Sequence, residues 1–134
     1  MPADSETAYL RVVVVEDDRA LRLILASWCR SIGMNVLAEF PDGQAAFDLL
    51  SADDEPNPDL ILTDCQMPRM DGIALVRQLR ARGNDTPVIM LSGHQDACIA
   101  DLARAAGVNC FVPKPLSTQS LHDALAQTLP GWAA

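Results

Sequence analysis

Residues 60–72 of the chain read LILTDCQMPRMDG, and this stretch decides how the rest of the sequence is interpreted. It opens with an apolar run, typical of a buried strand, and the run ends at Asp64. A carboxylate is costly to bury unless it is paired or bound to a metal. We therefore expect Asp64 to lie either at the open end of a strand or beside a cation.

Apolar runs of this kind recur along the chain and alternate with segments of helical period. Short runs rich in β-branched residues predict strands at 10–15, 35–40, 59–64, 88–92 and 110–112. Apolar residues spaced three or four positions apart predict helices at 19–32, 44–50, 72–83, 96–107 and 117–129. Strands that are apolar on both sides and alternate with helices indicate an α/β fold, with a parallel sheet covered on both faces.

The helical segments also carry end signals and apolar faces. Asp18 and Ser117 stand where an N-cap is expected, just before two of the helices. The apolar face of helix 19–32 is predicted to hold Leu21, Ile24, Leu25, Trp28 and Ile32. That of helix 96–107 is predicted to hold Ile99, Leu102, Ala103 and Ala106.

Length and composition indicate a single soluble domain. The chain has 134 residues, of which 49% are hydrophobic and 21% charged. We expect one domain over 10–129, with short tails at 1–9 and 130–134. No apolar run approaches the roughly 20 residues of a membrane span, and the first nine residues lack the pattern of a secretory signal. We therefore expect a cytoplasmic protein without membrane association.

Charge and cysteine spacing exclude further classes. The net charge of −8 argues against sequence-independent binding to nucleic acid, which requires a basic surface. The four cysteines include no Cys-x-x-Cys pair, which argues against a zinc site and against a disulfide framework. They are expected to be reduced thiols, mostly in the core.

Polar side chains follow four of the five predicted strands. They are Glu16, Asp17 and Asp18 after the first strand, Asp64 after the third, Ser92 after the fourth and Lys114 after the fifth. In an open parallel sheet, ligands bind outside the carboxyl ends of the strands. Taken singly, each residue has a simpler explanation: a helix cap for Asp18, a turn for Ser92 or a solvated surface position for Lys114. Together they indicate a site.

The chemistry of this group favours a divalent cation and a phosphate. Two carboxylates roughly 4–5 Å apart repel by about 3–4 kcal/mol at an effective dielectric constant near 20. Oxygen ligands suit a hard ion, and Mg2+ prefers one or two carboxylates, waters and a phosphate oxygen. A lysine provides a mobile positive charge for phosphate. The sequence therefore predicts a Mg2+-dependent phosphate site.

Four short motifs in this order resemble the receiver domain of two-component response regulators. They are VVEDD, LTDCQMPRMDG, MLSG and FVPKP, and the resemblance covers residues 10–129. It implies five helices around a doubly wound, flavodoxin-like parallel sheet of five strands in the order 2-1-3-4-5. It also implies a cis peptide bond between Lys114 and Pro115, which only an X-Pro bond reaches at low cost.

The resemblance also implies a role for each motif residue. Asp64 matches the phosphoacceptor, and Lys114 and Ser92 match the groups that contact the phosphoryl oxygens. The implied metal ligands are Glu16, Asp17, Asp64 and the backbone carbonyl of Gln66. Ser92 and Phe111 match the two switch positions. Gln66 and His94 occupy the positions that tune hydrolysis of the phosphoryl group in the family.

The implied function is signalling rather than catalysis on an external substrate. The phosphodonor would be a histidine kinase or a histidine phosphotransfer protein. The phosphorylated form would bind a downstream protein through the face formed by helix 96–107, strand 110–112 and the last helix. The chain could act alone, or be a receiver excised from a hybrid histidine kinase or a multidomain regulator.

Four rival interpretations fit the sequence less well. A degenerate receiver used only as an interaction module is disfavoured, because every motif position is filled. A Mg2+-dependent phosphatase with an aspartyl nucleophile shows Asp-x-Asp, whereas Gln66 stands at the second acidic position here. A nucleotide hydrolase requires a Gly-x-x-x-x-Gly-Lys-Ser/Thr loop, which the sequence lacks. A flavodoxin-type cofactor binder requires a first loop that accepts phosphate, whereas EDDRA would repel it.

Overall fold

The computed structural model describes residues 10–52, 57–93 and 97–129, and strands and helices alternate through them. The strands are β1 (Arg11–Val15), β2 (Asn35–Phe40), β3 (Leu60–Asp64), β4 (Val88–Ser92) and β5 (Cys110–Pro113). The helices are α2 (Arg19–Ser31), α3 (Gly43–Leu50), α4 (Gly72–Ala81), α5 (Ala97–Ala106) and α6 (Thr118–Thr128). Each element lies within one or two residues of its predicted bounds.

The five strands form one parallel sheet in the order β2-β1-β3-β4-β5. Register places Val13 beside Ile61, and Ile61 beside Val88, so the central strands are aligned along their lengths. The predicted fold class and strand order are confirmed. Every residue of β3 and β4 is buried, as expected for strands covered on both faces.

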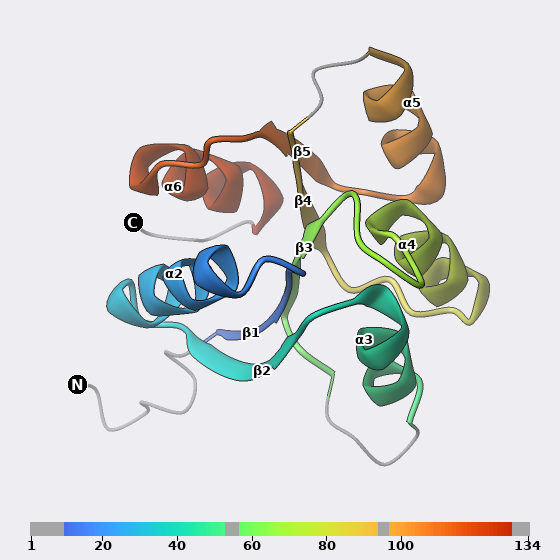
Figure 1. Ribbon diagram of the computed structural model, residues 1–134, viewed down its shortest axis with the longest axis horizontal. Coiled ribbons are helices and arrows are strands. Elements are labelled where there is room, and N and C mark those ends of the chain that lie inside the picture. Colours follow the sequence, from blue (N-terminus) through green and yellow to red (C-terminus); the bar gives the residue numbers. More distant parts are fainter. Residues whose placement is uncertain (1–9, 53–56, 94–96, 130–134) are drawn as a thin grey trace.

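Helices cover both faces of the sheet. Figure 1 shows α2 and α6 on one face and α3, α4 and α5 on the other. Alternate residues of each strand point to opposite faces, so β1 contributes Val12 and Val14 to the core under α2 and α6. Val13 and Val15 contribute to the core under the other three helices.

Short polar side chains fix where the helices begin. Asp18 accepts from the backbone N–H of Ala20 and Leu21, and Ser117 accepts from Ser120 N–H in a reciprocal capping box. Both predicted N-caps are confirmed. Asp42 and Asp71 cap α3 and α4 in the same way. The predicted cis peptide bond between Lys114 and Pro115 is also present.

Two predicted core positions lie at the surface instead. Leu25 is buried in α2 as expected, but its neighbour Ile24 is 44% exposed. Ala103 is buried in α5, whereas Leu102 is 49% exposed. In both helices the apolar stripe is wider than the strip of sheet that covers it. Helical period shows which residues share a face, but not how much of that face is covered.

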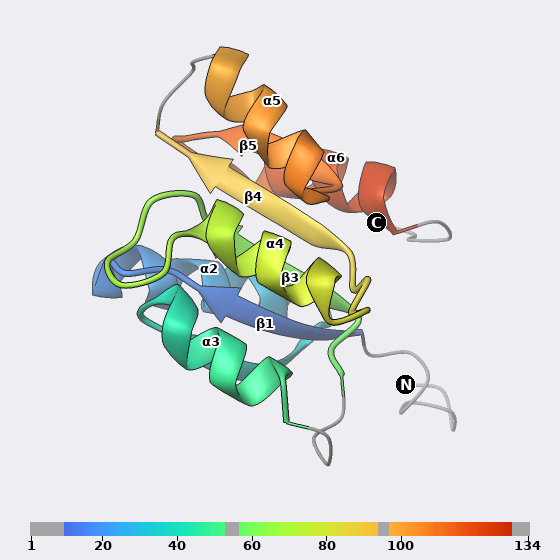
Figure 2. The ribbon, with the colours of Figure 1, turned by 90° about the vertical axis from the view of Figure 1, so that its right-hand side faces the viewer.

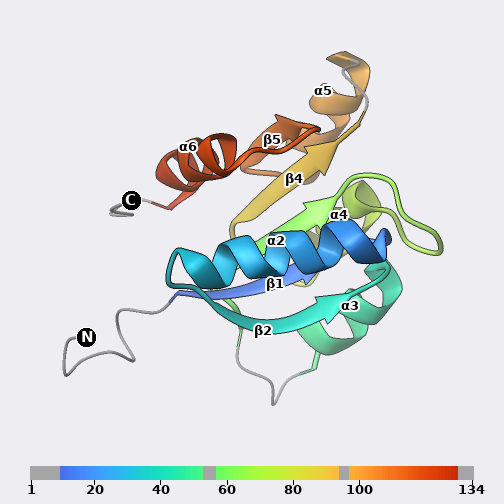
Figure 3. The ribbon, with the colours of Figure 1, turned by 60° about the vertical axis from the view of Figure 1, so that its left-hand side comes forward.

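The carboxyl ends of all five strands lie at one edge of the sheet. Figures 2 and 3 show that β1 starts, and α6 ends, at the opposite edge. None of the helices in the described residues is both long and apolar enough to cross a bilayer.

Candidate functional site

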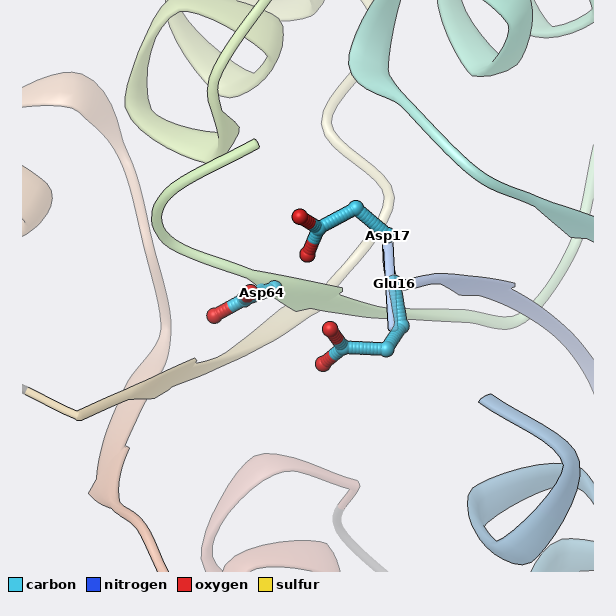
Figure 4. Close-up of side chains that lie close together, drawn as sticks. All are labelled: Glu16, Asp17 and Asp64. Atoms are coloured by element: carbon cyan, nitrogen blue, oxygen red, sulfur yellow. The ribbon is translucent and has the colours of Figure 1, made fainter. Parts of the chain in front are cut away.

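Three carboxylates meet at the carboxyl edge of the sheet. Glu16 and Asp17 follow β1 directly, Asp64 ends the neighbouring β3, and one oxygen from each lies within 4.8 Å of the others. Figure 4 shows their side chains turned toward a common space. Glu16 and Asp64 are buried, whereas Asp17 is exposed and forms the outer side of the group.

Lys114 supplies the opposite charge and follows β5, the strand at the end of the sheet order. Its Nζ lies 3.1 Å from Asp64 Oδ1 and 3.3 Å from Glu16 Oε1. The lysine follows β5, and its backbone N–H donates to the carbonyl of Ser92 at the end of β4. Burial alone would lower the pKa of Lys114, but Asp64 and Glu16 outweigh it and raise that pKa above its usual value.

Glu16 bears the highest electrostatic cost. Burial is the main cause that raises its pKa from 4.5 to about 7, and the Asp64 charge adds to it, although a hydrogen bond from Asp18 N–H opposes both. Glu16 Oε1 accepts no hydrogen bond among the described residues, despite its proximity to Lys114. A buried carboxylate oxygen that shares one lysine with Asp64 and faces two more carboxylates is suited to a further cation.

Asp64 is held in place but remains short of charge stabilisation. Its Oδ1 accepts from the N–H of Cys65 at 2.8 Å, and that N–H also donates to the carbonyl of Leu91. Burial raises the pKa of Asp64, while Lys114 opposes the shift. The carboxylate is therefore anchored through one oxygen, with a lysine as its partner.

The other predicted site residues lie around this group. Ser92 is 1% exposed at the end of β4, and Phe111 is half-buried against the core under α3, α4 and α5. Gln66 is exposed at the start of the β3–α4 loop. His94 lies outside the described residues.

Sequence reasoning missed two arginines that hold the loops of the site. Arg22 donates from Nη1 to the Glu16 carbonyl at 2.7 Å, which links α2 to the end of β1. Arg69, in the β3–α4 loop, forms an ion pair of 2.6 Å with buried Asp42 at the start of α3. Arg69 stands within the LTDCQMPRMDG motif, but the motif assigns it no role, and its partner lies 27 positions away. Arg22 is six positions from Glu16, and no local motif indicates its contact.

An apolar groove opens beside the carboxylate group. Its volume is about 520 Å³, and it is lined by Leu21, Ile24, Trp28, Leu91, Gly93, Lys114, Pro115 and Leu116. The groove therefore joins exposed Ile24 of α2 to the same lysine that contacts Asp64.

The residues present fit Mg2+ and a phosphoryl group. Carboxylate oxygens in an all-oxygen set are ligands that Mg2+ accepts, and Lys114 stands where it can contact an anion on Asp64. The described residues place no cysteine or histidine in this ligand group, which disfavours zinc.

Known proteins share this sequence and fold. The family model for the response regulator receiver domain matches residues 12–126. Response regulator MprA of Mycolicibacterium vanbaalenii is 36% identical over 113 residues, which are 84% of this chain and 47% of MprA. MprA of Mycobacterium tuberculosis is 35% identical over the same shares. The chain thus spans about half the length of these relatives.

Solved structures of receiver domains also resemble this chain in fold. The receiver domain of the putative response regulator NarL from Mycobacterium tuberculosis is 30% identical with a TM-score of 0.77, over 87% of this chain and 93% of that one. CheY in the CheX–CheY–BeF3–Mg2+ complex of Borrelia burgdorferi, at 24% identity, shares the fold, with a TM-score of 0.83 over 90% of each chain. The chain belongs to the response regulator receiver domain family.

Proposed function

We propose that this receiver domain accepts a phosphoryl group on Asp64 from a phosphohistidine, with Mg2+ as cofactor. The observation that supports this most directly is the placement of Asp64. Its carboxylate ends a central strand, within 4.8 Å of two other carboxylates and 3.1 Å from Lys114 Nζ. One nucleophile, a cation-binding acid group and a cation for phosphate are thus gathered at one point.

In the proposed reaction, an Asp64 oxygen attacks phosphorus as the phosphorus–nitrogen bond of phosphohistidine breaks. The imidazole leaves with the bonding electrons, and the product is an acyl phosphate on Asp64. When bound, Mg2+ offsets the charge on the phosphoryl oxygens. Glu16, Asp17, Asp64 and the Gln66 carbonyl are the proposed ligands. Lys114 would contact a phosphoryl oxygen from the opposite side.

We assign the apolar groove beside Lys114 to the protein that carries the phosphohistidine. It shares Lys114 and Gly93 with the edge of the sheet where Asp64 lies, and Ile24 offers it an exposed apolar side chain. A histidine kinase or a histidine phosphotransfer protein on this groove would present its imidazole to Asp64. Such donors place the domain in the cytoplasm.

Phosphorylation is proposed to act through Ser92 and Phe111. The phosphoryl group adds about 1.5–2 negative charges and new acceptors beside the buried Ser92 hydroxyl. Ser92 would turn toward these oxygens, and Phe111, half-buried on neighbouring β5, would move into the vacated space. The face formed by α5, β5 and α6 would then bind the downstream protein.

Phosphorylation by a small donor tests the proposal. Acetyl phosphate with Mg2+ is expected to add one phosphoryl group, read by intact mass, and the addition should need both the metal and Asp64. Asp64→Asn should remain unmodified, whereas Asp101→Asn, which changes a carboxylate that is 80% exposed on α5, should behave as wild type. Modification that persists in Asp64→Asn would refute the assignment.

A further inference from the structure

The loop that follows Asp64 is held at its middle by the start of α3. Arg69 donates from Nη2 and Nε to Asp42 Oδ2, at 2.6 and 3.1 Å. One residue later, the carbonyl of Met70 accepts from the N–H of Gly43 at 3.0 Å. A Cβ at Gly43 would overlap that carbonyl, so the two segments are in direct backbone contact.

The ion pair is unlike the other surface pairs of the protein. The Asp42 side chain is 4% exposed, and its second oxygen accepts from Ala45 N–H at 2.9 Å to cap α3. Both carboxylate oxygens are therefore used. A hydrogen bond from Ala45, followed by Arg69, lowers the pKa of Asp42, so the carboxylate is charged at neutral pH. Removing Arg69 would leave a buried charge with only its cap.

Arg69 also adopts a backbone conformation that its residue type seldom takes. Its φ is +68°, in the left-handed region that disfavours residues other than Gly, Asn and Asp. A contact must compensate for this cost, and the ion pair with Asp42 is the contact Arg69 makes. The loop is thus held in a shape that it would not adopt readily by itself.

We propose that Asp42 and Arg69 form a clamp that positions the β3–α4 loop for metal binding. The inference rests on the proposed function, in which the carbonyl of Gln66, three residues before Arg69, binds Mg2+. The loop has fixed ends, because Cys65 N–H donates to Leu91 and Gly72 N–H donates to the Cys65 carbonyl. The clamp fixes the stretch between them. Asp42 and Arg69 are positioning residues that do not touch the ion.

The direction in which one substitution changes Mg2+ affinity separates a positioning role from a purely electrostatic one. Arg69→Asn removes the ion pair but tolerates the left-handed backbone. Losing one positive charge near a cation site would, by electrostatics alone, tighten binding of Mg2+. Loss of positioning would weaken it, on the order of tenfold, the low end for contacts outside the ligand shell. We expect the weaker binding, measured as the Kd of the folded protein by calorimetric titration with Mg2+.

Two further variants act as controls. Arg30→Asn removes an equal charge from an exposed pair with Glu39, at 3.4 Å near the end of α2, and should leave the Kd unchanged. Arg69→Lys keeps the charge and should restore part of the affinity. Amide hydrogen exchange of Gly43, whose N–H bonds to the loop, should be faster in Arg69→Asn.

The outcomes distinguish the two proposals. Wild-type protein that binds Mg2+ no more tightly than Arg69→Asn would overturn the clamp and leave the proposed function intact. Wild-type protein that binds no Mg2+ would overturn both. A fall in unfolding free energy without a change in Kd would show that the ion pair only stabilises the fold, and would also overturn the clamp.

Discussion

At the scale of single residues, the site is a balance among three carboxylates and one ammonium. Glu16 and Asp64 are buried, and both lie near Lys114 Nζ. One lysine therefore serves two carboxylates, while Asp17 adds a third charge from the exposed side. Burial is the main cause of the raised pKa values of Glu16 and Asp64, and a lysine shared between them leaves a deficit of positive charge. A divalent cation would remove this deficit.

The first prediction concerns pH. The pKa of Glu16 is 4.5 for the free side chain and about 7 in the fold, so between these values the folded state binds more protons. The unfolding free energy of metal-free protein should therefore fall as pH rises through this window. Glu16→Gln should flatten that fall, as measured by urea unfolding with a chelator present. Parallel curves for both proteins would contradict the assignment.

The affinity for Mg2+ is expected to change with pH in the opposite direction to the unfolding free energy. Mg2+ needs the carboxylates deprotonated, so its affinity should rise as pH passes upward through about 7. The same titrations at several pH values would show whether protons leave as the ion binds.

The residue scale is also where sequence reasoning was least complete. Asp64, Lys114 and the acid pair could be predicted because each stands at the end of a strand, and strand ends share one edge. The contact between Arg69 and Asp42 could not be predicted, because it joins two loops that are 27 positions apart. No periodicity or local motif encodes such a pair.

At the scale of elements, close packing of α4 against β3 sets the geometry behind Asp64. Gly72 starts α4, and its N–H donates to the Cys65 carbonyl at 2.8 Å. A Cβ at this position would overlap the Asp64 carbonyl oxygen and lie 3.0 Å from Met90 Cε. The glycine allows the helix to begin directly beside the strand that carries Asp64, the proposed phosphoacceptor.

Two alanine substitutions test this packing. Gly72→Ala should lower the unfolding free energy by about 1–3 kcal/mol, since backbone or core must shift. Gly93→Ala is the matched control: its Cβ would meet no atom of the described residues within 4 Å, and its effect should stay within about 0.5 kcal/mol. Chemical denaturation measures both. Equal losses in the two variants would contradict the role given to Gly72.

The exposed side of α2 supports a prediction about the phosphodonor. Ile24→Glu places a charge in the apolar groove without touching the core, since Ile24 is 44% exposed. Transfer from a phosphohistidine protein should slow by tenfold or more, on the scale of an interface hot spot. Phosphorylation by acetyl phosphate should be unchanged.

A matched substitution controls for surface charge. Leu102→Glu alters a leucine that is 49% exposed on α5, on the other face of the sheet. It should leave both donors unaffected. If the two variants slow protein transfer equally, the groove is not the donor surface.

The helical period predicted which residues share an apolar face, but it did not predict which part of that face the sheet covers. Leu25 and Ala103 lie in the core as predicted, whereas Ile24 and Leu102 on the same helices do not. Which part of an apolar stripe is covered depends on where the sheet ends. That boundary arises from strand order, which no single helix contains.

At the scale of the whole molecule, the parallel sheet converts sequence order into a site. Motifs that stand far apart along the chain follow β1, β3, β4 and β5, and the strand order brings them to one edge. That the motifs share one edge was predictable, because ligands bind at the carboxyl ends of the strands in an open parallel sheet. The strand order itself was implied by the family resemblance. The two apolar cores stabilise the fold, whereas the clustered carboxylates destabilise it through burial and mutual repulsion.

Binding of Mg2+ should therefore stabilise the entire domain. A ligand that binds only the folded state adds about 2.7 kcal/mol at 100 times its Kd. Asp17→Asn should lose most of this gain, yet its metal-free form should be at least as stable as wild type, because a like charge is removed from the group. Thermal unfolding with and without Mg2+ measures both effects. An undiminished gain in Asp17→Asn would exclude this carboxylate as a ligand.

The start of β1 and the end of α6 lie on the same side of the molecule, and this has a practical consequence. The first strand starts, and the last helix ends, at the edge farthest from the carboxylates. A fluorescent reporter, an affinity handle or a surface tether joined directly before β1 or directly after α6 would therefore attach behind the reactive edge. Immobilised in this way, the molecule would keep Asp64 facing solution, and phosphodonors could be screened on a sensor chip.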